Sequence, residues 1–207
     1  MPTILLCTII LAIWISYQRK KSDKSTKKTS EQFWELEQRS NFTRPKDLST
    51  LDYITVDFEN LPFSQSDDEE IIYVQEQLLK LKGQKIVNLT GQSNTDLKLA
   101  YGNANLVQLT IYDQNYTLLI RNLNKWGQLL FSKGEIPTAK QVLEYALSVN
   151  SDISQTFLTL AMIYSNENDS KALTDLRDKA ISLDSPLKES LIQKLTAICD
   201  KANHTLK

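Results

Sequence analysis

The nucleophiles and bases that commonly drive catalysis are scarce in this sequence, which holds one histidine and two cysteines. His204 stands in a polar C-terminal tail, where no Ser/His/Asp or Cys/His arrangement can be built around it. Cys199 lies near Leu195 and Ile198 on an expected helix, so we expect it to pack as a small hydrophobic residue. The sequence therefore predicts a protein that is not an enzyme.

The sequence shows no pattern that is typical of a metal site or a phosphate site. No spaced cluster of cysteine and histidine suggests zinc, and Gly83, Gly91 and Gly102 are isolated rather than gathered in a phosphate-binding loop. The acidic run over residues 67–70 is explained by the first turn of a helix, where negative charge favours the helix dipole. The best candidate for a functional loop is the polar stretch 90–96, which we interpret as a turn with a helix cap. We expect no cofactor.

Charge is distributed unevenly along the chain. The net charge is −1, but residues 19–28 carry six basic side chains and one acidic side chain, so the rest of the chain is acidic. A mildly acidic body argues against nucleic acid as a partner. If Cys7 belongs to the apolar N-terminal segment, Cys199 stands alone in the body, which fits a reducing compartment.

An almost unbroken apolar run covers residues 2–17. A cleaved signal peptide would need a basic leading region and small residues at its end, and this run has neither. A lipoprotein signal would need small residues before Cys7, where the chain has Leu5 and Leu6. An uncleaved membrane helix would be about 24 Å long against a hydrocarbon core of about 30 Å. Local bilayer thinning and snorkelling Arg and Lys side chains can close that gap, so we expect an anchor.

The basic flank predicts the orientation of this anchor. Basic residues next to a membrane helix tend to remain cytoplasmic, so we expect residues 18–207 to face the cytoplasm of a single-pass membrane protein. The flank would also lie close to anionic headgroups, which makes membrane lipid a predicted partner of residues 2–17 and of the basic segment.

A short amphipathic helix is expected over residues 30–39. Ser30 can cap it, and Phe33, Trp34 and Leu36 form an apolar patch. This helix either docks on the main domain or lies on the membrane surface, and we expect docking.

The next segments combine an extended stretch with short helices. Residues 51–63 alternate with a strand-like period of two, but no second strand is evident, so we expect an extended segment laid across a helical body. Ser66 is expected to cap a helix that ends at Gly83. Another short helix is expected to end at Tyr101, before Gly102.

From residue 112 onward the sequence predicts nearly continuous helix with short breaks. The fold class is therefore all-α, built from antiparallel helical hairpins with an N-terminal transmembrane helix. The predicted divisions are an anchor over 1–18, a basic linker over 19–30, an irregular helical part over 31–111 and a helical array over 112–203.

The helical array repeats weakly at a shift of 34 residues. Large apolar residues meet large apolar ones and small residues meet small ones in these pairs: Leu123 and Phe157, Trp126 and Leu160, Gly127 and Ala161, Leu130 and Tyr164, Gly134 and Asn168, Ala146 and Ala180, Leu147 and Ile181. Gly134 and Asn168 both suit a left-handed turn conformation.

The spacing of the small residues Gly127, Gly134, Ala139 and Ala146 resembles the tetratricopeptide repeat family. The resemblance covers roughly residues 120–202, about two repeats followed by a capping helix. It implies helical hairpins whose first helices form a concave face that binds a peptide or a partner helix. The chain is also similar to small membrane-anchored bacterial proteins with a helical cytoplasmic tail.

The positions that the resemblance assigns to the concave face are Arg121, Asn124, Gln128, Phe131, Gln155, Leu158, Met162 and Ser165. The family members that clamp a terminal carboxylate use Lys and Asn where this chain has Asn124 and Gln128, so that ligand class is not implied. This face is either open or filled by residues 51–111.

The sequence therefore favours a membrane-anchored cytoplasmic adaptor or scaffold that binds an unidentified protein or peptide. Two alternatives stay open: a regulatory or accessory subunit of a membrane-associated enzyme, or a sensor with a small-molecule pocket. A third is an extracytoplasmic protein with a cleaved signal.

Overall fold

The computed structural model describes Trp14 and residues 30–63 and 66–205, with side chains described to residue 200. The regular elements of the described residues are all helices, with one isolated antiparallel bridge between Tyr53 and Val87, which confirms the all-α prediction. A helix covers residues 30–41. The further helices are α2 (Glu69–Leu79), α3 (Asn94–Tyr101), η1 (Asn103–Asn105), α4 (Leu106–Ser132), α5 (Ile136–Ser148), α6 (Ser154–Asn166), α7 (Ser170–Ile181) and α8 (Lys188–Thr205).

Two compact units make up the chain. Among the described residues, unit 1 holds residues 30–50 and 92–107, and unit 2 holds residues 51–63, 66–91 and 108–205. The boundary predicted between residues 111 and 112 falls inside α4, because that helix runs without a break from Leu106.

Unit 1 joins the helix over residues 30–41 to α3 through polar side chains. The carboxylate of Glu37 accepts hydrogen bonds from the Lys98 ammonium and from Thr95 Oγ1, the latter at 2.6 Å. The predicted apolar patch of this helix takes no part in these bonds: Phe33, Trp34 and Leu36 are exposed. The helix therefore contacts α3 through its polar residues.

A capping box begins α3, as expected for the polar stretch 90–96. The Ser93 side chain accepts the backbone N–H of Asp96, and the Asp96 carboxylate accepts the backbone N–H of Ser93. The helix ends at Gly102, whose positive φ of 91° suits glycine. A Cβ at this position would overlap the backbone of Arg44 and Pro45, so glycine is also required by the close approach of two segments.

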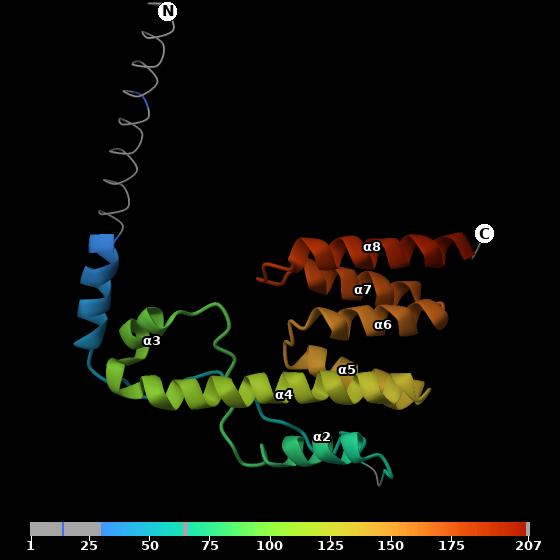
Figure 1. Cartoon of the computed structure of the whole chain (residues 1–207), viewed down its shortest axis with the longest axis horizontal. Helices are drawn as coiled ribbons and strands as arrows, with labels where there is room; N and C mark the ends of the chain where they lie inside the picture. Colours follow the sequence, from blue (N-terminus) through green and yellow to red (C-terminus); the bar gives the residue numbers. More distant parts are fainter. Residues whose placement is uncertain (1–13, 15–29, 64–65, 206–207) are drawn as a thin grey trace, which may run out of the picture. The chain divides into compact units, whose positions relative to one another are not determined.

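In unit 2 the helices α5, α6, α7 and α8 lie side by side in chain order (Figure 1). Their apolar faces and that of α4 form one core, in which Trp126, Leu143 and Phe157 are fully buried. Gly127 is the small residue at the contact between α4 and α5, since an added Cβ would overlap the Leu143 side chain.

The turns after α4 and after α6 share one geometry. Gly134 and Asn168 both have positive φ, 81° and 57°, which confirms the predicted left-handed conformation at each position. The residue after each one donates its backbone N–H five positions back, Glu135 to Leu130 at 3.0 Å and Asp169 to Tyr164 at 2.9 Å.

Residues 51–63 form no strand, as expected, and pair with the turn after α2 only through the isolated Tyr53–Val87 bridge and a neighbouring backbone bond. Besides the Tyr53 bridge, the Ile54 N–H donates to the Ile86 carbonyl at 2.9 Å. Further along, the Asp57 N–H donates to the Tyr145 hydroxyl at 2.8 Å. The partner was not evident because the pairing joins residues more than 30 positions apart, through backbone groups that any residue carries.

Helix α2 starts later than predicted. Its N-cap is Asp68, whose carboxylate accepts the backbone N–H groups of Glu70 and Ile71, whereas the Ser66 hydroxyl accepts the N–H of Asp68 itself. Both residue types are good caps, and the carboxylate stands where it also meets the Lys133 ammonium at 2.6 Å.

The predicted anchor (except Trp14) and the basic segment 19–28 lie outside the described residues. Within the described ranges, no helix has both the length and the apolar character needed to cross a membrane.

Candidate functional site

Helices α4 and α6 carry the eight residues of the predicted binding face. Four belong to α4 and four to α6, and the two helices are joined by side-chain hydrogen bonds. We call this region, defined by the eight residues, the α4–α6 face. Arg121, Gln155 and Met162 are exposed on it, while Asn124, Gln128, Phe131, Leu158 and Ser165 are half-buried.

Two of the predicted binding residues hold the helices together. Asn124 Oδ1 accepts a hydrogen bond from Thr156 Oγ1 at 3.0 Å, and Gln128 Nε2 donates to Thr159 Oγ1 at 2.8 Å. Both threonines are fully buried, so these bonds satisfy polar groups that water does not reach. Asn124 and Gln128 therefore have a structural role, and a role in partner binding stays a prediction for them.

The apolar residues of the face also differ, since two of them pack on the core and one is exposed. Phe131 and Leu158 pack against the hydrophobic core. Met162 is 37% exposed and can offer an adaptable apolar contact. Arg121, Gln155 and Met162 are thus the residues of this face best placed to meet a partner.

The segment before α2 crosses unit 2 at a different place. The Phe63 ring packs on the Trp126 ring with centroids 5.0 Å apart, and Gln141 Nε2 donates to the Asn60 carbonyl at 2.9 Å. Together with the Asp57–Tyr145 bond, these contacts reach α4 and α5 at residues outside the predicted eight.

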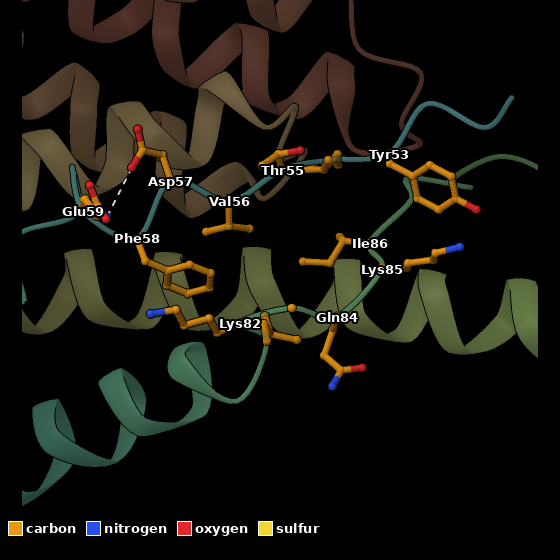
Figure 2. A pocket seen from close by; sticks show the side chains of 13 residues that line it. Tyr53, Thr55, Val56, Asp57, Phe58, Glu59, Lys82, Gln84, Lys85 and Ile86 are labelled. Carbon is orange, nitrogen blue, oxygen red and sulfur yellow. Dashed lines mark hydrogen bonds between the residues drawn. The ribbon is translucent and has the colours of Figure 1, made fainter. Parts of the chain in front are cut away.

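A pocket of about 580 Å³ opens beside the Tyr53–Val87 bridge. It is bordered by the extended residues 53–59 and by the turn 81–86 (Figure 2). The side chains of Val56, Phe58 and Ile86 give it an apolar floor, and its volume lies in the range of small-molecule sites. Sequence reasoning missed this pocket because the pairing that forms it was not evident.

Charged side chains of both signs surround this pocket. Lys82 and Lys85 line it together with Asp57 and Glu59. The Lys85 ammonium lies 5.1 Å from the centre of the Tyr53 ring, an attractive cation–π arrangement. Burial raises the pKa of Tyr53, while the nearby Lys85 charge opposes that rise. The phenol therefore stays neutral at physiological pH.

A second, smaller pocket of about 260 Å³ is lined mainly by residues of polar type and involves the start of the candidate loop 90–96. Thr90 lines it with Asn88, Asp152, Lys179 and Asp184 among others. The Lys179 ammonium donates to the Leu147 carbonyl near the end of α5, and burial lowers the pKa of Lys179. That bond gives Lys179 a structural role at a helix C-terminus.

The remaining chemical candidates stand apart from these pockets. Cys199 is half-buried against the core, and burial raises the pKa of its thiol, which disfavours the reactive thiolate. The side chain of His204 lies outside the described residues. Across the part of the chain that the structure describes, no three His, Cys, Asp or Glu side chains converge to hold a metal ion.

No protein-family model matches the chain, and comparison with curated proteins and with solved structures finds no significant match.

Proposed function

We propose that this chain is a membrane-anchored adaptor that binds a protein partner through the α4–α6 face. The observation that carries the proposal is the exposure of Arg121, Gln155 and Met162 on helices whose other predicted face residues fix the scaffold. An exposed cation, an amide and a flexible thioether on rigid helices are suited to recognising a peptide or a partner helix.

The proposed architecture is a short tetratricopeptide-like array, with α4–α5 and α6–α7 as antiparallel hairpins and α8 as a capping helix. Its support comes from the equivalent turns at Gly134 and Asn168, which stand 34 residues apart and share their hydrogen bonds. Gly127, tightly packed against Leu143, stands where the family pattern has a small residue.

The proposed anchor is the apolar run over residues 2–17, with the folded body in the cytoplasm. Protease treatment of spheroplasts expressing the chain tests this orientation. We expect residues 30–207 to survive in intact spheroplasts and to be digested after detergent permeabilisation. Digestion in intact spheroplasts would contradict the proposed topology.

Affinity capture from detergent-solubilised membranes tests the face itself. We expect Arg121→Glu to remove a partner that the wild-type chain retains, because reversing an exposed interface charge weakens association. Lys171→Glu makes the same charge change at an exposed position on α7 and should leave that partner bound. Loss of the partner with both variants would argue against a specific role for the face.

A second candidate function, ligand-dependent regulation, is favoured by the pocket between residues 53–59 and 81–86. Native mass spectrometry of the chain purified from its host tests it. A bound small molecule that is absent from a Val56→Arg variant would support this function, and a ligand-free wild-type chain would count against it.

A further inference from the structure

The helix over residues 30–41 carries an uncovered aromatic edge at its N-terminal end. Phe33 is 53% exposed and Trp34 is 65% exposed, and their rings pack edge to face with centroids 5.6 Å apart. Leu36, three positions after Phe33, is also exposed. Large apolar side chains grouped in this way mark an interaction surface more often than scattered single ones do.

Unit 1 covers only the far end of this helix face. Residues three and four positions apart lie on one side of a helix, so Glu37 and Ser40 continue the line that begins at Phe33. Glu37 is bound by Thr95 and Lys98 of α3, and Ser40 is fully buried. Lys98 Nζ also donates to Asn41 Oδ1 at 2.8 Å. These polar bonds hold the helix by its C-terminal half and leave Phe33, Trp34 and Leu36 uncovered.

The charges near this edge identify what fits it. Residues 19–28, directly before the helix, carry six basic side chains and one acidic one, which would attract anionic lipid headgroups. The acidic residues Glu31 and Glu35 stand about half a helical turn from Phe33, on the opposite side of the helix. A helix laid with Phe33 toward the bilayer would therefore turn these carboxylates away from the headgroups.

We infer that the aromatic edge formed by Phe33, Trp34 and Leu36 lies in the interface of an anionic membrane. Tryptophan and phenylalanine are suited to that depth, where apolar rings leave water without entering the hydrocarbon core fully. This inference rests on the proposed function, since it takes residues 2–17 as the anchor that brings the helix to the membrane. The edge would then fix unit 1 against the bilayer instead of leaving it on a free tether.

The three tryptophans of the chain permit a direct test. The full chain is reconstituted into vesicles of equal parts phosphatidylcholine and phosphatidylglycerol, with or without bromine on the acyl chains, which quenches nearby tryptophan. In the Trp14→Phe chain the tryptophan emission comes from Trp34 and Trp126, and in the Trp34→Phe chain it comes from Trp14 and Trp126. In the double variant it comes from Trp126 alone. Trp126 is fully buried in unit 2 and supplies the baseline.

We expect the Trp14→Phe chain to lose emission in brominated vesicles beyond the loss shown by the double variant. No extra loss there, with clear loss in the Trp34→Phe chain, would overturn the inference while the anchor stands. That result would leave a second copy or another protein as the occupant of the edge. No extra loss in either single variant would overturn the anchor and the inference together.

Matched substitutions test whether the quenching depends on the aromatic edge or on exposed apolar side chains in general. In the Trp14→Phe background, Phe33→Ser with Leu36→Ser should reduce the quenching of Trp34. Ile181→Ser with Leu187→Ser removes two exposed apolar side chains from unit 2 and should leave the quenching unchanged. Equal reduction by both pairs would contradict the assignment of the edge.

Discussion

Gly127 shows how one residue fixes the approach of two helices. It lies inside α4, where glycine costs about 1 kcal/mol relative to alanine, and the Leu143 side chain of α5 occupies the space that a Cβ would need. Packing therefore outweighs helix propensity at this position.

Gly127→Ala should destabilise the chain by about 1–3 kcal/mol, because the added methyl overpacks a filled core. Chemical denaturation followed by circular dichroism measures the change. Leu143→Ala empties the same space, so Gly127→Ala should cost less in that background than in the wild type. An unchanged cost in the Leu143→Ala background would show that the two side chains do not compete for space.

Glu37 makes the attachment of the helix over residues 30–41 depend on pH. Hydrogen bonds from Lys98 and Thr95 lower the pKa of its carboxyl below the ordinary value of 4.5. A lowered pKa in the folded state means that the ionised form stabilises the attachment above pH 4.5. That contribution is lost as the pH falls through the lowered pKa.

Hydrogen-exchange protection factors of residues 33–41 should therefore be constant from pH 7 to pH 5 and should fall below pH 4.5. Glu37→Gln keeps the shape of the side chain without its charge. We expect this variant to have lower protection at pH 7 and a weaker dependence on pH. The same fall in protection in both proteins would assign the pH effect to other groups.

Among the elements, the helices with strong local signals could be predicted from sequence. α3 ends at Tyr101, as predicted, and the turns at Gly134 and Asn168 take the predicted left-handed conformation. The start of α2 was misplaced because Ser66 and Asp68 are both capable caps, and only the fold brings Lys133 to Asp68. Local patterns carry no information about such tertiary partners.

The candidate site was likewise predictable only in part from the sequence. The resemblance to the repeat family assigned Arg121 and Gln155 to the predicted face, and both residues are exposed. It could not show that Thr156 and Thr159 would bind Asn124 and Gln128, because the polar contacts across two helices depend on how the helices pack. The pocket beside residues 53–59 was missed for an equivalent reason, since its walls come from segments far apart in the sequence.

The joint between α4 and α6 can be tested by a double-mutant cycle. Asn124→Ala and Thr156→Val each remove one partner of a hydrogen bond whose donor is fully buried. We expect each to destabilise the chain, with a coupling of about 0.5–1.5 kcal/mol in denaturant titrations. Additive effects would mean that the bond contributes nothing to stability and would leave Asn124 free to bind a partner.

At the scale of the whole molecule, chain order and packing order differ. Residues 92–107 belong to unit 1 with residues 30–50, while the segment between them belongs to unit 2. Composition and periodicity describe segments one at a time, so they predicted consecutive divisions instead of this exchange. α4 begins in unit 1 and continues into unit 2.

The α4–α6 face is, in our central proposal, the surface through which a membrane-anchored adaptor binds its partner. Photocrosslinking in living cells tests it most directly, with a photoreactive residue placed singly at Gln155 or Met162 and, as a control, at the exposed Asp175 of α7. We predict one shared adduct from Gln155 and Met162 that is absent from Asp175. An adduct of that mass from Asp175 alone, or no adduct from either face position, would contradict the proposal.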